Sequence, residues 1–337
     1  MGSFCCKGIP KNEIILNLNR TKKNHIKQLT NDSYSHLSLD NSFCIFNSIN
    51  NILYLIYANI NRSIIAYNIV NNKKMLEIKN AHEEYITNFR YYLDNIKKRD
   101  LIISISSDDT NIKIWNINFE CLININNLNE DGYLFSACLL NYKNQLYIVI
   151  PSIEFIRTFD FNGNQIKALK DYNESIVIID NFYDNEICIN YIITGNTGYI
   201  KSYDFNSNKI YYKYCDNDES EHYSIIINNK NNIKEMIETC SDGYIRIWNF
   251  HSGELLRRIK TYYGLLKGIC LWNKDFLYVG CNFNSIYLID LNKSISIDEI
   301  KGYNAICIKK IIHPFYGDCL IFQGYENNQI QLLININ

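Results

Sequence analysis

The sequence has little proline, little methionine and almost no net charge. Only 3 Pro and 3 Met occur in 337 residues, and the formal net charge is -1. A nucleic-acid-binding body usually has a basic excess, so no nucleic-acid partner is expected. No apolar run reaches the ~18 residues that a membrane-spanning helix needs, and no secretory signal is present. We therefore expect a cytoplasmic protein.

The cysteines lack any arrangement typical of a metal site. There are 12 of them, without a C-x-x-C pair and without a Cys/His cluster at zinc-ligand spacing. Most lie inside apolar runs, for example Cys44, Cys188 and Cys270. We expect reduced, buried thiols, as is usual in a cytoplasmic protein. No metal and no other cofactor is expected.

Aromatic and β-branched residues are abundant, which favours an all-β fold. Hydrophobic residues make up 47% of the chain, with 27 Tyr and 16 Phe, and such residues fit a pleated, half-buried surface. Asn occupies about one position in seven, far above ordinary usage. Its runs lie between apolar stretches, so we interpret them as turns in which Asn adopts positive φ in place of the scarce Gly.

A repeat runs through the chain. Two segments, "SSDDTNIKIWNINF" and "SDGYIRIWNF", each place Trp six residues after Asp: Asp109 and Trp115, then Asp242 and Trp248. The two Trp lie about three periods of 44 residues apart, within the range of propeller repeats. The equivalent positions, roughly 41 to 48 residues apart, are Tyr67, Trp115, Phe159, Tyr203, Trp248, Ile289 and Leu333.

Each period contains four short apolar runs separated by turn residues, the pattern of a four-stranded propeller blade. The sequence therefore predicts an all-β, seven-bladed propeller in residues 24–337, preceded by a tail, 1–23. Because the seventh copy ends at its third strand, we expect residues 24–30 to supply the fourth and close the ring. The expected blades are approximately 42–80, 84–127, 133–169, 173–216, 222–260, 264–300 and 303–337.

These repeats resemble the WD-repeat family, whose landmarks are a Gly-His before the first strand and a Trp-Asp ending the third. Here the Gly-His position is Ala81-His82 in the second copy and Glu221-His222 in the fifth. The resemblance implies a buried relay of His, strand hydroxyl, Asp and Trp. Carried over, the relay residues are His82, Ser107 (or Ser106), Asp109 and Trp115, and His222, Thr239, Asp242 and Trp248. A His/Ser/Asp hydrolase triad is the alternative, but the repeat already explains each residue as scaffolding.

The chain begins MGSFCCKG, which suggests lipid attachment. Gly2 is the acceptor in N-myristoylation, although Cys6 stands where that motif prefers Ser or Thr. Cys5 and Cys6 are candidate palmitoylation sites, and two acyl chains anchor a protein stably. We predict a leash that holds the propeller at the cytosolic face of a membrane. An unmodified tail is the alternative.

Two sets of residues are candidates for a partner-binding surface. The first set is acidic: it would bind a basic peptide, or it belongs to a solvated loop. The second set is aromatic: it would be a binding hot spot, or its rings fill the places that His has in other copies of the repeat. The sets are Asp216, Asp218, Glu219 and Glu221, and Tyr172, Tyr263 and Tyr303.

The sequence contains no Gly-rich phosphate loop, no H-E-x-x-H and no G-x-S-x-G. No catalytic residue and no small-molecule substrate is therefore assigned. We expect a non-enzymatic scaffold that binds proteins or peptides. The alternatives are a membrane-targeted adaptor whose lipidation is its main function, and a propeller hydrolase, which the mostly apolar inner strands disfavour.

Overall fold

The computed structural model describes residues 13–15, 25–30, 41–108, 110–126, 134–152, 154–170, 176–216, 219–261, 264–324 and 329–334. Across these ranges every regular element is a β-strand. No helix in them is long and apolar enough to cross a lipid bilayer.

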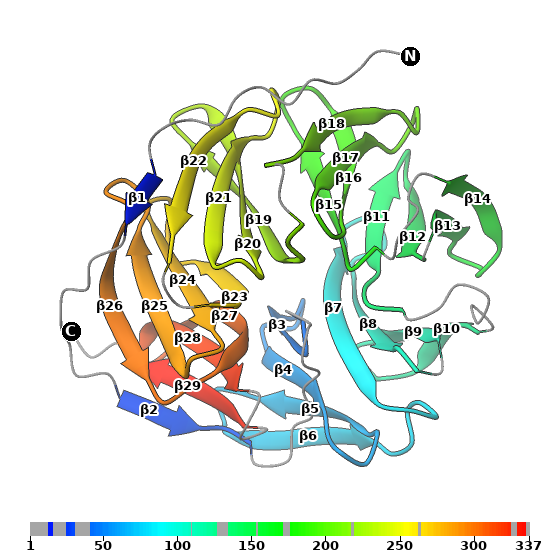
Figure 1. Cartoon of the computed structure of the whole chain (residues 1–337). Helices are drawn as coiled ribbons and strands as arrows, with labels where there is room; N and C mark the ends of the chain where they lie inside the picture. The colour runs from blue at the N-terminus through cyan, green and yellow to red at the C-terminus, as the bar shows by residue number, and fades with distance from the viewer. Residues whose placement is uncertain are drawn as a thin grey trace. The chain divides into compact units, whose positions relative to one another are not determined.

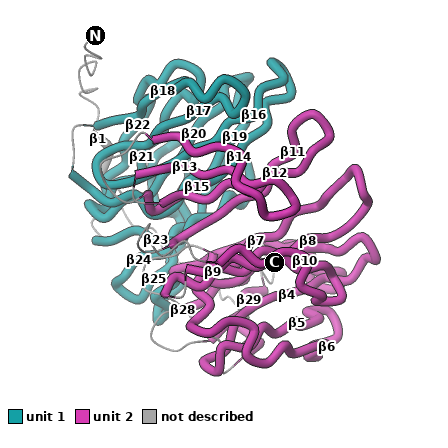
Figure 2. Tube along the Cα trace, turned by 90° about the vertical axis from the view of Figure 1, so that its right-hand side faces the viewer, with its two compact units in different colours: residues 1–22, 180–305 teal, residues 23–179, 306–337 magenta. Residues whose placement is uncertain are grey.

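The described strands form seven sheets, the blades of a seven-bladed β-propeller (Figure 1). Each blade has four antiparallel strands, and one blade carries a fifth. The predicted all-β, seven-bladed class is thus confirmed. The chain divides into two compact units, which are described separately (Figure 2).

Unit 2 comprises residues 23–179 and 306–337 and contains four blades. Their strands are, in blade 1, β3 (Phe43–Asn47), β4 (Leu53–Ala58), β5 (Ile64–Asn68) and β6 (Lys73–Ile78); in blade 2, β7 (Ile86–Asp94), β8 (Arg99–Ser106), β9 (Asn111–Asn116) and β10 (Cys121–Ile125); in blade 3, β11 (Cys138–Tyr142), β12 (Gln145–Pro151), β13 (Phe155–Asp160) and β14 (Gln165–Lys170); and in blade 7, β27 (Ala305–His313), β28 (Gly317–Gly324), β29 (Ile330–Ile334) and β2 (His25–Gln28).

Unit 1 comprises residues 1–22 and 180–305 and contains three blades. Their strands are, in blade 4, β15 (Ile178–Asp184), β16 (Ile189–Gly195), β17 (Ile200–Asp204) and β18 (Ile210–Tyr214); in blade 5, β19 (His222–Lys230), β20 (Ile233–Cys240), β21 (Tyr244–Asn249) and β22 (Leu255–Lys260), with β1 (Glu13–Ile15) added; and in blade 6, β23 (Leu266–Leu271), β24 (Phe276–Cys281), β25 (Ser285–Asp290) and β26 (Ile295–Lys301).

The last blade is completed by the N-terminal strand, as predicted. Strand β2 pairs antiparallel with β29, with Ile26 opposite Leu333. Without β2, the row of backbone N–H and C=O groups on β29 would form an unpaired edge, which invites aggregation. Pairing β29 with a strand from the start of the chain therefore completes blade 7 and covers this edge.

The repeat position noticed in the sequence marks a β-bulge. In blades 1 to 6 the register between the third and fourth strands shifts at this residue, or at its cross-strand partner in blade 2. Trp248, for example, pairs with Leu255, whereas Ile247 pairs with Arg257. A bulge adds one residue and increases the local twist. The 44-residue period thus records a recurring backbone irregularity.

The residue after each bulge caps the following turn. Asp160 Oδ1 accepts from the backbone N–H of Asn162 at 2.9 Å and of Asn164 at 2.8 Å. The same type of bond is made by Asn68, Asn116, Asp204, Asn249 and Asp290. Asn and Asp side chains satisfy a turn in this way. In blade 7 the fourth strand is β2, so β29 needs no such turn and carries Ile334 instead.

The core lies on the second and third strands of each blade, while the fourth strand is the outer edge, except in blade 5, where β1 lies outside β22. In β20 every residue except Ile233 is buried, whereas in β6 the first four residues are exposed. Asparagine supplies positive φ at several turns, including Asn51 (59°), Asn232 (63°) and Asn284 (54°). This agrees with the expectation that Asn replaces Gly in the turns.

Candidate functional site

Blade 2 contains a neutral buried network around Trp115. The Ser104 hydroxyl lies between two rings: Trp115 Nε1 donates to Ser104 Oγ at 2.8 Å, and His82 Nε2 lies 2.7 Å from the same oxygen. His82 is 2% exposed. Burial, and then the charge of Lys113, lowers the pKa of His82 to about 3. The imidazole is therefore neutral at physiological pH, packs in the interior of the blade and forms a hydrogen bond with Ser104.

The hydroxyl between the rings belongs to Ser104, and the expected Ser107 lies elsewhere. Ser107 Oγ donates to the backbone carbonyl of Leu134 at 2.8 Å and lies 2.7 Å from Thr87 Oγ1. The expected carboxylate, Asp109, lies outside the described residues. Successive strand residues face opposite sides, so Ser107, three residues after Ser104, does not share its face. The alternative, Ser106, shares that face but lies two residues further along β8.

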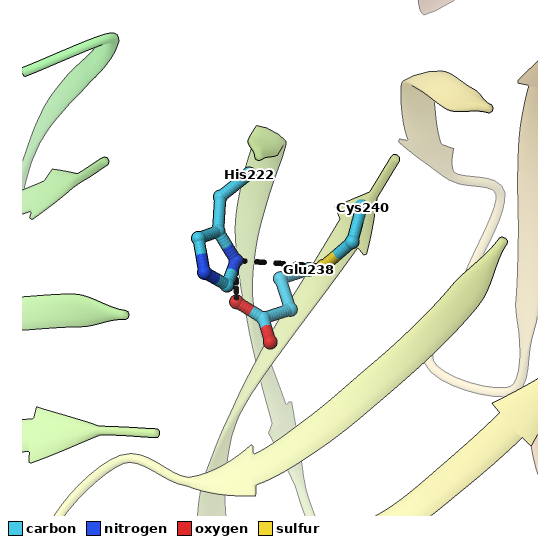
Figure 3. A group of neighbouring side chains, drawn as sticks. All are labelled: His222, Glu238 and Cys240. Carbon is cyan, nitrogen blue, oxygen red and sulfur yellow. Dashed lines mark hydrogen bonds and ion pairs between the residues drawn. The ribbon is translucent and has the colours of Figure 1, made fainter. Parts of the chain in front are cut away.

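Blade 5 repeats the geometry with charged groups. Trp248 Nε1 donates to Glu238 Oε1 at 2.9 Å, and His222 Nδ1 lies 3.0 Å from Glu238 Oε2. Cys240 Sγ lies 3.4 Å from the same nitrogen (Figure 3). Glu238 and Cys240 are 0% exposed and His222 is 2% exposed. A carboxylate thus takes the place that the Ser104 hydroxyl has in blade 2.

Register shows that the two networks are equivalent. Ser104 pairs with Lys113, and Glu238 pairs with Arg246; each partner is two residues before the Trp. One step further along the same face, blade 2 has Ser106 and blade 5 has Cys240. The same two positions therefore hold two hydroxyls in one blade, and a carboxylate and a thiol in the other.

Arg246 is the hub of the blade 5 network. This fully buried guanidinium pairs with Asp216 (Nε to Oδ2, 2.7 Å) and with Asp242 (Nη2 to Oδ2, 2.5 Å). Its Nη1 also lies 3.0 Å from Cys240 Sγ. Burial alone would lower the pKa of Arg246, but Cys240, Asp242 and Glu238 outweigh it and raise that pKa. Conversely, burial would raise the pKa of Asp242, and Arg246 lowers it.

The remaining relay residues expected in blade 5 have other partners. Thr239 lies on the opposite face from Glu238, and its Oγ1 donates to the backbone carbonyl of Lys267 at 3.0 Å. Asp242 pairs with Arg246 and accepts from the Tyr244 backbone N–H at 3.0 Å. The relay expected from the resemblance is therefore rearranged, with Glu238 between His222 and Trp248. The signal in the sequence is Glu238 itself, a carboxylate two residues before Cys240 in the strand "IKEMIETC".

The expected acidic surface is only partly exposed. Asp216 is buried. Its carboxylate pairs with Arg246 and with Arg258, whose Nη1 lies 3.1 Å from Asp216 Oδ2. It therefore belongs to the interior of the blade, contrary to the sequence-based interpretation of a surface acid. Glu219 and Glu221 are exposed. Asp218 lies outside the described residues.

The tyrosine set is mostly outside the described ranges, which do not include Tyr172 and Tyr263. Tyr303 is half-buried, and its backbone N–H donates to the Asn284 carbonyl at 3.2 Å. This carbonyl also accepts from Gly302 at 2.7 Å. Tyr303 thus lies where the turn between β24 and β25 meets the connection from β26.

The loops of unit 1 on this side of the blades bond to one another in series. Gly198 N–H donates to the Ser220 carbonyl at 2.8 Å, and Ser241 N–H to the Glu221 carbonyl at 2.9 Å. The series continues from Thr261 to Gly243 (3.0 Å), from Asn282 to Leu265 (3.1 Å) and from Gly302 to Asn284 (2.7 Å). We call residues 196–199, 219–221, 241–243, 264, 282–284 and 302–303 the unit 1 loop surface.

One large apolar side chain protrudes from the unit 1 loop surface. Phe283 is 62% exposed, and its ring lies over Gly264, where an added Cβ would lie 2.6 Å from Phe283 Cε2. Gly264 also has φ of +66°, which side chains rarely adopt. The exposed acids Glu219 and Glu221 belong to the same surface. It therefore combines an exposed aromatic ring with two exposed carboxylates.

The candidate lipidation residues Gly2, Cys5 and Cys6 lie outside the described residues. Within the expected tail, however, Glu13–Ile15 forms strand β1 and pairs parallel with β22 of blade 5, with Ile14 opposite Ile259. The backbone of the expected leash is therefore docked on a blade edge at this point.

No protein-family model matches the chain, and no curated protein sequence matches it.

Proposed function

We propose that this chain is a WD-repeat-type interaction scaffold that binds a protein or peptide on the unit 1 loop surface. The observation that carries the proposal is that these loops are bonded in series and that Phe283 is exposed among them. A rigid surface with an exposed aromatic anchor loses little conformational entropy on binding. The fold is compatible with such a role, and the role itself is inferred by analogy.

The chemistry of the surface favours a partner with basic and apolar residues. Glu219 and Glu221 supply negative charge and Phe283 supplies an apolar contact. When the charges of two partners are complementary around an apolar contact, association is faster and wrong partners are disfavoured. A basic peptide with a bulky apolar residue fits this description.

A scaffold role suits the buried polar residues better than catalysis does. His82 and Ser104 resemble part of a hydrolase triad, but both are buried around Trp115. A catalytic group must come within hydrogen-bond reach of its substrate. These residues instead satisfy the indole N–H, as buried polar groups require.

The finer proposal is that acyl chains on Gly2, Cys5 and Cys6 tether the scaffold to the cytosolic face of a membrane. Gly2 precedes Glu13 of β1 by 13 − 2 = 11 residues. An extended chain spans at most about 3.5 Å per residue, so the anchor would keep blade 5 within about 40 Å of the bilayer. The N-terminal peptide of protein from its native source should then carry a myristoyl group. An unmodified peptide contradicts the tether and leaves the loop surface untouched.

The docking surface is tested by charge reversal. Glu219→Lys combined with Glu221→Lys should weaken the affinity for a directly binding partner at least tenfold. Partners are first identified by affinity purification with mass spectrometry, then measured with purified components by calorimetry. The matched control is Glu254→Lys, an exposed acid in the turn before β22. Equal affinities for the wild type and the double variant would contradict the proposed surface.

A further inference from the structure

Three buried side chains of blade 5 have the composition and spacing of a metal site. His222 begins β19, and Glu238 and Cys240 lie two residues apart on β20, on the same face (Figure 3). Their ligand atoms, one nitrogen, one carboxylate oxygen and one sulfur, all lie within 4.8 Å of one another. We infer that His222, Glu238 and Cys240 bind a zinc ion.

Two of the three separations between ligand atoms are near those of a zinc site. Nδ1 of His222 lies 3.0 Å from Glu238 Oε2 and 3.4 Å from Cys240 Sγ. In a tetrahedral site with Zn–N and Zn–O near 2.1 Å and Zn–S near 2.3 Å, the corresponding separations are about 3.4 and 3.6 Å. The imidazole would therefore shift by a few tenths of an ångström, and the Glu238 oxygen and Cys240 sulfur, which lie within 4.8 Å of each other, would settle about 3.6 Å apart. Nitrogen, carboxylate oxygen and thiolate sulfur are all ligands that zinc accepts.

The surrounding groups orient the three ligands. Trp248 Nε1 donates to Glu238 Oε1 at 2.9 Å, which leaves Oε2 toward His222. Arg246 Nη1 donates to the Cys240 sulfur at 3.0 Å and so holds its position. Partners of this kind fix the direction of metal ligands and tune the site. With three protein ligands, the fourth position is left for water or another small ligand.

The charges around the site are compatible with a bound cation. The network contains three carboxylates, on Asp216, Glu238 and Asp242, and two guanidiniums, on Arg246 and Arg258. Their sum is −3 + 2 = −1. A divalent ion together with the Cys240 thiolate adds one positive charge and brings the sum to zero.

Blade 2 is an internal comparison. The equivalents of Glu238 and Cys240 there are Ser104 and Ser106, whose neutral hydroxyls are weak zinc ligands. His82 is retained and bonds to Ser104. The inference is therefore confined to blade 5, where both substitutions supply anionic ligands.

The test measures metal in the untagged full-length chain. The purified wild-type protein should contain about one zinc per chain by elemental mass spectrometry. Refolding with Co²⁺ in place of zinc should give a thiolate-to-cobalt charge-transfer absorption band. A folded wild-type protein with less than about a tenth of an equivalent of zinc and no such band would overturn the inference.

Variants assign the site. Cys240→Ser should abolish the cobalt band, and Glu238→Gln should weaken zinc binding at least tenfold while keeping an acceptor for Trp248. Cys281→Ser, another fully buried cysteine in unit 1, is the control and should keep the band. If Cys240→Ser retains the band and Cys281→Ser loses it, His222, Glu238 and Cys240 are not the site. The wild-type measurement decides the matter even where a variant fails to fold.

Discussion

Blades 2 and 5 place a tryptophan at the same bulge and a histidine near the start of the first strand, but they surround the two rings with different chemistry. In blade 2 the bridging group is the Ser104 hydroxyl, and in blade 5 it is the Glu238 carboxylate. The blade 5 carboxylate is accompanied by Arg246, whose position in blade 2 is held by Lys113. The blade scaffold therefore fixes the position of the bridging group but not its charge.

The difference has an energetic consequence. Lys113 is half-buried, and its Nζ donates to a neutral acceptor, the backbone carbonyl of Ala81, at 2.7 Å. Arg246 is 1% exposed and bonds two carboxylates. A buried ion pair is costly to break because its former partners stay buried and uncompensated. Blade 5 should therefore depend on its polar network much more than blade 2 does.

The largest expected effect is at Arg246. Arg246→Met should lower the free energy of unfolding by about 3–5 kcal/mol, because Asp242 loses its guanidinium partner and the buried Asp216 keeps only Arg258. Lys113→Met, the matched change in blade 2, should cost about 1 kcal/mol or less. Urea unfolding at neutral pH measures both. Equal losses would show that the two networks contribute alike.

The next effect is a pH dependence from blade 2. Burial lowers the pKa of His82 from 6.5 to about 3. Between pH 6.5 and pH 3, His82 is protonated in the unfolded chain but neutral in the folded protein. The free energy of unfolding therefore falls as the pH falls. At pH 4.5, two units below 6.5, the loss is about 2.7 kcal/mol.

The His82→Gln variant isolates this contribution. It keeps a polar group near Ser104 but does not titrate, so its free energy of unfolding should fall less between pH 7 and pH 4.5 than that of the wild type. Urea titrations at the two pH values provide the comparison. Parallel losses in both proteins would mean that His82 does not carry the effect.

A smaller difference is expected between the two tryptophans. Trp115→Phe and Trp248→Phe remove similar volume, so their difference isolates the lost hydrogen bond. Trp248 donates to the charged Glu238, and Trp115 donates to a neutral hydroxyl. Hydrogen bonds to charged groups contribute about 1 kcal/mol more than neutral ones. Trp248→Phe should therefore be the more destabilising by about that amount in thermal or urea unfolding, and the reverse order would contradict this.

The smallest effect should be the same in both blades. Asn116 and Asn249 cap the turn after the third strand, accepting from Glu120 N–H at 2.9 Å and His251 N–H at 3.0 Å. Replacing either by Ala should cost about 1 kcal/mol, the usual contribution of one such bond. A large inequality in unfolding free energy would show that the turns are not equivalent, although the bulges are.

Local features of the fold were readable in the sequence because they depend on neighbouring residues. The Asn and Asp positions after each third strand, such as Asp160 and Asn249, predict turns, and their spacing gave the seven blades. The closing strand was predicted because the seventh copy had three strands, and β2 pairs with β29.

The buried networks were predicted less well because they depend on register across hairpins. His222 meets Cys240 and Glu238 only because the β19–β20 pairing shifts between His222 and Ser224. Residue spacing along the chain does not reveal this shift, because a β-bulge changes which residues of the two strands lie opposite each other. The expected Thr239 is one residue from Glu238, and this single step places its side chain on the opposite face. Asp216 lies in an acidic stretch of sequence typical of a surface loop, and only the fold brings Arg246 to it.

Photo-crosslinking tests most directly whether unit 1 presents the docking surface. A photoreactive phenylalanine analogue is placed at Phe283, which is 62% exposed on the unit 1 loop surface, and separately at Phe315, which is 74% exposed in the β27–β28 turn of unit 2. The account predicts a discrete covalent adduct from Phe283 in native cells, and none of that mass from Phe315. An adduct from Phe315 alone, or identical adducts from both positions, would contradict it.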